Sequence, residues 1–178
     1  MDGNDATTDW CTIISAHEVL LWRTAYRILS HREDALDCCQ QAVLDAYEYS
    51  LTHQVDQWGG LLTSLTVRRA IDRLRHRVRS RRMTASLEEV AEPLADGDGP
   101  VELAEASELI GRLRNALAAL PDKQAEVFWL SCVEQSSHAE IGRLMAITPN
   151  ESRVLLHRAR AHLASMLDTR RLNAGREL

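Results

Sequence analysis

Two short segments with the same helix-capping pattern constrain the fold of this chain more than any other feature. Residues 137–140 read SHAE and residues 148–151 read TPNE, so each places a hydroxyl side chain three positions before a glutamate. This spacing is typical of a helix start, because the hydroxyl and the carboxylate each satisfy a free backbone amide. The second segment also has proline at the first helical position. We expect a helix-turn-helix, made of a short helix over 139–145, a tight turn and a longer helix that begins at 149. The alternative is an ordinary helical hairpin.

The remainder of the chain also indicates helix. Leu, Ala, Arg and Glu are frequent, and apolar residues recur at helical spacing through residues 11–82 and again from residue 109. Between these segments, residues 83–106 contain Pro93 and the run DGDGP, with few large apolar side chains. We therefore predict an all-α fold of two small helical domains, residues 10–82 and 107–170, joined by a flexible acidic linker, residues 83–106.

The charge of the chain is distributed very unevenly. A net charge of −5 argues at first against a nucleic-acid partner. However, eight arginines lie between residues 67 and 82, opposed only by Asp72, and the next 26 residues hold eight acidic residues with no lysine or arginine. Arginine suits phosphate and base recognition better than lysine does, so this run predicts DNA contacts, although a solvated helix face gives the same pattern. The acidic segment could cover the arginine run in the free protein, or act as a plain spacer.

Several classes of protein are disfavoured by the sequence. No apolar stretch approaches the roughly 20 residues of a membrane helix, and the polar N-terminus is unlike a signal peptide, so we expect a soluble cytoplasmic protein without a membrane partner. The adjacent Cys38 and Cys39 point about 100° apart on a helix and do not form a metal clasp, which argues against a thiol or metal sensor. Nucleotide-binding and catalytic motifs are absent. We expect no cofactor, no metal and no enzymatic activity.

Motifs along most of the chain resemble those of one protein family. Residues 33–47 read EDALDCCQQAVLDAY, and residues 70–75 read AIDRLR. Farther along stand LP at 120–121, EVF at 126–128, EIG at 140–142 and HRAR at 157–160. In this order and spacing, over roughly residues 15–167, the motifs resemble the extracytoplasmic-function group of bacterial sigma factors, within the sigma-70 family.

The resemblance implies a function for each half. The first half would dock on core RNA polymerase and read the minus-ten promoter element, and the second would read the minus-thirty-five element through its helix-turn-helix. The implied polymerase-binding residues are Asp37, Gln40, Gln41, Leu44 and Glu48. The implied DNA-binding residues are Trp58, Arg68, Arg69, Arg73, Arg75, Asn150, Arg153, Val154, His157 and Arg158. Trp58 could equally fill the domain core. Promoter DNA and core polymerase are the expected partners, and an anti-sigma factor is left open.

The sequence departs from the family pattern at several positions. Gln41 stands where the family has glutamate and Tyr47 where it has tryptophan. In the second helix of the helix-turn-helix, Ser152 replaces a buried valine and Leu155 replaces a phosphate-binding arginine. The runner-up hypothesis is a helix-turn-helix regulator that binds duplex DNA without engaging polymerase. That hypothesis explains residues 107–167 but gives the motif over 34–47 no purpose.

Overall fold

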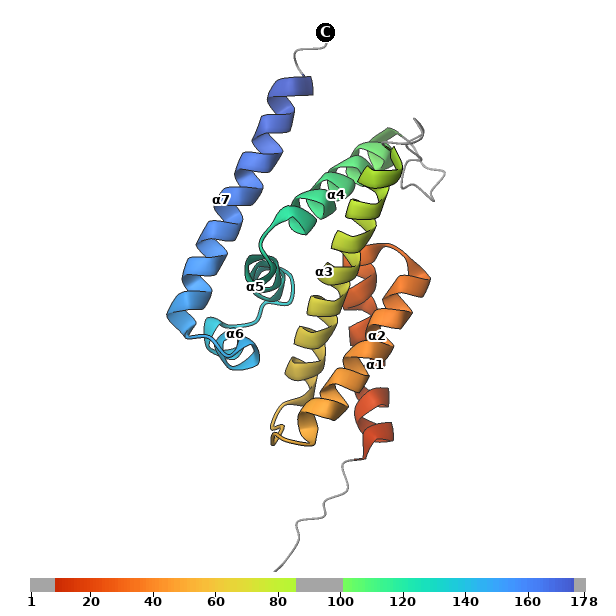
Figure 1. The fold of residues 1–178 in the computed structure, drawn as a ribbon, viewed down its shortest axis with the longest axis vertical. Helices are drawn as coiled ribbons and strands as arrows, with labels where there is room; N and C mark the ends of the chain where they lie inside the picture. The colour runs from red at the N-terminus through yellow and green to blue at the C-terminus, as the bar shows by residue number, and fades with distance from the viewer. Residues whose placement is uncertain (1–8, 86–100, 175–178) are drawn as a thin grey trace, which may run out of the picture.

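The computed structural model describes residues 9–85 and 101–174, and these residues form seven helices (Figure 1). The helices are α1 (Trp10–Leu29), α2 (Arg32–Ser50), α3 (Trp58–Ala85), α4 (Val101–Ala119), α5 (Asp122–Cys132), α6 (His138–Met145) and α7 (Pro149–Ala174). The prediction of an all-α fold is confirmed for the described residues. None of their helices is long and apolar enough to cross a membrane.

Helices α1, α2 and α3 form a bundle because each has one apolar face. On α2 that face is made of small residues at helical spacing, listed here: Ala35, Cys38, Ala42 and Ala46. Small side chains allow α2 to approach α1 and α3 closely, and larger residues such as Leu21, Leu62 and Ile71 fill the space between the helices. The connection between α1 and α2 is tight, with Ser30 in the left-handed conformation (φ 47°).

Helices α6 and α7 form the predicted helix-turn-helix. At α6 the Ser137 hydroxyl accepts from the Glu140 amide at 3.2 Å, and the Glu140 carboxylate accepts from the Ser137 amide at 2.7 Å. At α7 the Thr148 hydroxyl and the Glu151 carboxylate form the same pair of bonds, at 3.1 and 2.7 Å. Both capping boxes are therefore confirmed, and they set the ends of the turn as the sequence predicted.

Glycine allows the turn between α6 and α7 to close. A Cβ atom added to Gly142 would lie 2.7 Å from the Ile147 carbonyl oxygen, closer than real Cβ atoms come. The Gly142 carbonyl in turn accepts hydrogen bonds from the amides of Ala146 and Ile147, and Ala146 adopts the left-handed conformation (φ 52°) that ends α6. The turn thus brings the start of α7 directly against α6.

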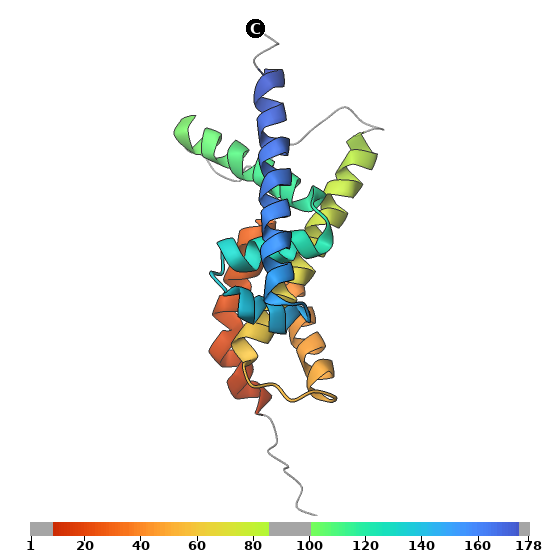
Figure 2. The same ribbon diagram turned by 90° about the vertical axis from the view of Figure 1, so that its left-hand side faces the viewer.

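The two halves of the chain pack against each other instead of lying apart. In Figures 1 and 2, α4, α5 and α6 lie between α7 and the long helix α3. A single buried cluster includes Ile71 and Leu74 of α3 together with Leu117, Leu120 and Leu130 of the second half. The division into domains 10–82 and 107–170 therefore remains a prediction about folding units. In this structure the helices of the two proposed domains are in contact with each other.

The described helices extend into both ends of the predicted linker. Helix α3 continues to Ala85, and α4 begins at Val101, whereas the linker was expected to span 83–106. Residues 86–100, which carry the Pro93 and DGDGP signals, lie outside the described residues.

Candidate nucleic-acid interface

The residues predicted to bind polymerase form an exposed stripe along α2. Asp37, Gln40, Gln41, Leu44 and Glu48 are all exposed, and Leu44 leaves 55% of its surface open. Such a stripe, opposite the buried small residues of α2, is the arrangement that a docking face requires. It is also the arrangement of an ordinary surface helix, so a second feature of the same face is informative.

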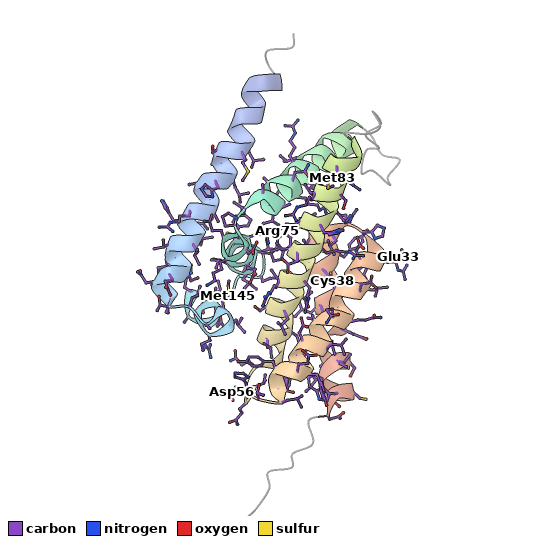
Figure 3. All side chains as sticks on the ribbon, viewed as in Figure 1. Glu33, Cys38, Asp56, Arg75, Met83 and Met145 are labelled. Carbon is purple, nitrogen blue, oxygen red and sulfur yellow. The ribbon has the colours of Figure 1, made fainter. Side chains whose placement is uncertain are left out.

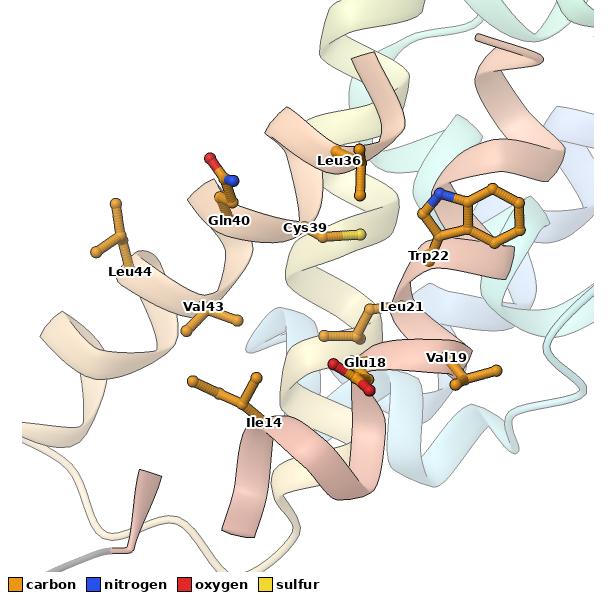
Figure 4. Close-up of a pocket in the computed structure, with 10 residues that line it drawn as sticks. All are labelled: Ile14, Glu18, Val19, Leu21, Trp22, Leu36, Cys39, Gln40, Val43 and Leu44. Carbon is orange, nitrogen blue, oxygen red and sulfur yellow. The ribbon is translucent and has the colours of Figure 1, made fainter. Parts of the chain in front are cut away.

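That second feature is an apolar groove of about 620 Å³ between α1 and α2 (Figure 4). It is lined by Ile14, Glu18, Val19, Leu21, Trp22, Leu36, Cys39, Gln40, Val43 and Leu44. Gln40 and Leu44 thus belong both to the stripe and to the groove. The groove could not be predicted from local sequence patterns, because it depends on how α1 crosses α2. The available signal was the run of apolar residues on α1, such as Val19 and Leu20, which are exposed in the structure.

The first pair of arginines on α3 consists of exposed Arg68 and half-exposed Arg69, and only Arg69 is tied to α2 by a described contact. Arg69 Nε and Nη2 donate to the two Asp45 carboxylate oxygens, both at 2.6 Å. These hydrogen bonds lower the pKa of the Asp45 carboxyl. Gln41, in the predicted polymerase-binding stripe, also donates to Asp45 Oδ1, at 3.2 Å. A bidentate bond of this kind fixes the plane of the guanidinium.

Arg73, one turn farther along α3, is also held by a carboxylate of α2, but both of its bonds go to a single oxygen. Its Nε and Nη2 atoms donate to Asp34 Oδ1 at 2.9 and 2.7 Å. Asp34 is buried, and its other carboxylate oxygen lies 3.3 Å from Arg77. Asp37 of the stripe lies 3.8 Å from Arg73. Carboxylates on α2 therefore orient two of the four α3 arginines that were predicted to contact DNA.

Arg75 points to the second half of the chain instead (Figure 3). Its side chain is only 14% exposed. The guanidinium donates to the carbonyl oxygens of Ala118 (3.3 Å) and Leu120 (2.8 Å), and lies 2.5 Å from the Asp122 carboxylate. In this arrangement Arg75 has little surface open to DNA, and its role as a DNA contact stays a prediction.

Trp58 packs in an aromatic cluster at the start of α3. Its ring makes an edge-on contact with Trp10, with centroids 4.9 Å apart, and Trp10 makes a second one with Tyr47 at 5.5 Å. Trp58 is half-buried, so of its two predicted roles the packing role has direct support here.

The predicted reading face of α7 is open. Asn150, Arg153, Val154, His157 and Arg158 are exposed, while the opposite side of the helix, formed by Ser152, Leu156, Ala159 and Leu163, is buried. In the part of the chain that the structure describes, Arg153 and Arg158 have no hydrogen-bond or ion-pair partner. Residues at the first turns of such a helix are the ones that reach base edges in a major groove.

The two departures from the family pattern in α7 have different structural consequences. Ser152 is fully buried, and its hydroxyl lies 2.9 Å from His138 Nδ1 of α6, so the polar group has a partner that also ties the two helices together. Leu155 is half-buried and packs against the core. It is therefore a packing residue, which the sequence left open beside the loss of a phosphate contact.

The cysteines lie apart from these surfaces. Cys38 is buried and Cys39 half-buried, and burial raises the pKa of each thiol to about 11. Cys11 and Cys132 are exposed and lie in different halves. Among the described residues, no group of three or more His, Cys, Asp or Glu side chains could hold a metal ion.

A helix-turn-helix with an exposed second helix, packed beside a bundle with an arginine-lined helix, is an arrangement that helical DNA-binding proteins use. Residues 110–163 match the family model described as "Sigma-70, region 4". The chain is 28% identical over 169 residues to the ECF RNA polymerase sigma factor SigE of Mycolicibacterium smegmatis, covering 92% of this chain and 65% of SigE. It is 24% identical to the ECF RNA polymerase sigma factor SigW of Bacillus subtilis, covering 87% of each chain.

A solved structure has the same fold. The sigma factor RpoE of Bartonella quintana, in a co-crystal with the anti-sigma factor NepR, matches with a TM-score of 0.52 at 15% identity, covering 91% of this chain and 98% of that one. The chain is thus similar, over most of its length, to the extracytoplasmic-function group of sigma factors whose motifs its sequence resembles.

Proposed function

We propose that this protein is a sigma factor that binds core RNA polymerase and directs it to promoters for transcription initiation. The observation that carries the proposal is the shared use of α2. One side of this helix presents the stripe from Asp37 to Glu48 beside an apolar groove, and its carboxylates, Asp34 and Asp45, hold the arginines of α3. A helix that links a docking face to a cationic helix suits a protein that joins polymerase to DNA.

The roles of the individual residues follow from this arrangement. Asp37, Gln40, Gln41, Leu44 and Glu48 would contact polymerase, and the groove would receive an apolar side chain of it. Arg68, Arg69 and Arg73 would contact promoter DNA near the minus-ten element, some of them through phosphates. Asn150, Arg153, Val154, His157 and Arg158 would read the minus-thirty-five element, with Arg153 placed as a guanine reader.

The proposed activity involves no chemistry on a substrate, so the protein would act as a binding component of the transcription machinery in the cytoplasm. An anti-sigma factor is a further proposed partner, since the Bartonella quintana relative of this fold was crystallised with one. The competing proposal, a regulator that binds duplex DNA alone, would leave the stripe and groove of α2 without a role.

Run-off transcription with core polymerase from the source organism tests the proposal. A variant carrying Asp37→Arg and Leu44→Asp should lose polymerase binding and transcription while keeping its helix content. Glu33→Gln, on an exposed residue of α2 outside the stripe, is the matched control and should behave like the wild type. Transcription that persists with both stripe changes would contradict the proposal, and duplex binding without any polymerase binding would support the regulator.

A further inference from the structure

Arg68 and Arg69 are neighbours on α3, but their guanidinium groups are in different surroundings. Arg68 is exposed, whereas Arg69 makes two charge-assisted bonds, each of 2.6 Å, to the Asp45 carboxylate of α2. A guanidinium has five N–H donors, so three are left after Nε and Nη2 have each given one. The Arg69 side chain is 43% exposed. Arg69 therefore keeps donors at the surface although its charge is paired with a carboxylate.

Asp45 is held in turn from a second side. Gln41, one turn earlier on α2, donates to Asp45 Oδ1 at 3.2 Å, and the same oxygen accepts from Arg69 Nη2. The Asp45 side chain is only 16% exposed, and these hydrogen bonds lower the pKa of its carboxyl, so it stays ionised at neutral pH. An ionised glutamate, the family's residue in place of Gln41, could not donate to Asp45. The glutamine therefore fixes the carboxylate that fixes Arg69.

A paired arginine and an unpaired one differ in how they meet DNA. Phosphate oxygens are negatively charged and would compete with Asp45 for the same guanidinium, so Arg69 gains little from the DNA backbone. Base edges present uncharged acceptors at fixed places, and the orientation of a donor decides how well it matches them. Arg69 is therefore suited to a base edge, while Arg68, with its free charge, is suited to a phosphate.

We propose that Asp45 is a specificity-determining positioning residue, which holds Arg69 as a reader of a base edge in the minus-ten element and suppresses its use as a general phosphate contact. The inference rests on the proposed function, in which α3 contacts the promoter. Asp45 does not touch DNA in this role but acts through Arg69. Its removal should therefore move sequence preference and general DNA affinity in opposite directions, which loss of a merely structural ion pair would not do.

The test uses the full chain assembled with core polymerase of the source organism, and a pool of duplexes with a randomised central segment. Sequencing of the bound duplexes measures base preference, and titration of the unselected pool against salt measures general affinity. Asp45→Asn keeps the shape of the side chain and removes its charge. It should reduce the preference at one base position about fivefold, tighten binding of the unselected pool about threefold, and steepen the salt slope by about one unit. Glu33→Gln, an exposed charge on the same helix, is the matched control and should change neither.

Two changes of Arg69 show whether Asp45 acts through it. Arg69→Lys keeps the charge but loses the two-bond geometry, so it should lose the same base preference as Asp45→Asn. In the Arg69→Ala background, Asp45→Asn should have no further effect on base preference. A preference that survives Asp45→Asn, or that Asp45→Asn alters equally in the Arg69→Ala background, would overturn the proposal. A failure of the proposed function is separate, because the wild-type assembly itself would then show neither base preference nor run-off transcription.

Discussion

The two halves of the molecule hold their cationic side chains in opposite ways. In the first half, Arg69 donates to both carboxylate oxygens of Asp45, and Arg73 donates twice to one carboxylate oxygen of Asp34. In the second half, Arg153 and Arg158 of α7 lie on the surface without a partner among the described residues. A paired arginine is well oriented but partly neutralised, whereas an unpaired one keeps its full charge and its conformational freedom. The comparison indicates that the first half supplies fixed geometry and the second supplies adaptable contacts.

Removing Asp34 should produce the largest effect and would test whether the ion pairs organise the first half. Asp34→Ala leaves Arg73 and the mostly buried Arg77 without their carboxylate, so we expect a loss of about 3 kcal/mol in the free energy of unfolding. Asp37→Ala is the control, because Asp37 is 67% exposed and should cost under about 0.5 kcal/mol. Urea unfolding followed by circular dichroism measures both, and equal losses would show that the pairs have no organising role.

In the second half, the change that should lower stability most is one in the turn between α6 and α7. Gly142→Ala places a Cβ atom 2.7 Å from the Ile147 carbonyl oxygen, so the turn between α6 and α7 must move, at a cost of about 2 kcal/mol. The control is Gly111→Ala in α4, where nothing lies within 4 Å and the better helix propensity of alanine should add up to about 1 kcal/mol. Thermal unfolding of the two variants should therefore shift in opposite directions; a shared direction would contradict the geometry.

Leu155→Arg restores the charge that the family has in α7 and tests how open that helix is. Because Leu155 packs against the core, we expect the variant to lose about 1 kcal/mol of stability and to gain little affinity for duplex DNA. Val154→Arg adds the same charge at an exposed neighbour on the reading face, so it should tighten binding to duplex DNA overall and change the sequence preference. The DNA affinity of both variants, measured against salt concentration on several promoter sequences, would distinguish their effects. Tighter binding by Leu155→Arg without loss of stability would mean that α7 is rotated from its present position.

The smallest expected effect concerns Glu126, where the halves meet. Burial raises the pKa of this carboxyl above its ordinary value, so the folded protein binds its proton more readily than the unfolded chain does. Stability should therefore fall as the pH rises from the ordinary glutamate pKa through the raised one. Glu126→Gln should remove this dependence and add about 0.5 kcal/mol at neutral pH, with no difference in acid. The free energy of unfolding, measured for both proteins across that pH range, tests this prediction. If Glu126→Gln is less stable than the wild type at neutral pH, the attraction between Glu126 and Arg68 outweighs the cost of burying the carboxylate.

How much of the molecule could be predicted depended on the range of the interactions concerned. The start of α7 was predicted to the residue, because Thr148, Pro149 and Glu151 act on backbone groups within one turn. The exposure of the α2 stripe also followed from local periodicity. The partner of Ser152 could not be predicted in this way, because His138 lies 14 residues earlier and the pairing depends on the angle between two helices.

The contact between the halves was missed for the same physical reason. The arginine run was interpreted as a surface for DNA, but Arg75 caps a helix end 43 residues later in the chain. No local pattern distinguishes Arg75 from Arg73, since both lie in one cationic run, and only the packing of α4 and α5 separates them. The ends of the linker were shifted for a simpler reason: residues 83–85 and 101–106 have ordinary helix propensity, and the glycine and proline signals lie between them.

Helix α3 has a consequence for how the protein is made. Ile71 and Leu74 are buried partly by Leu117, Leu120 and Leu130, which the ribosome adds about 50 residues later. At about 5–20 residues per second, this apolar stripe waits several seconds for its cover during synthesis. The nascent first half therefore exposes apolar surface of α3 in that interval. Slowly translated codons between α3 and α5 would lengthen the period in which chaperones are needed.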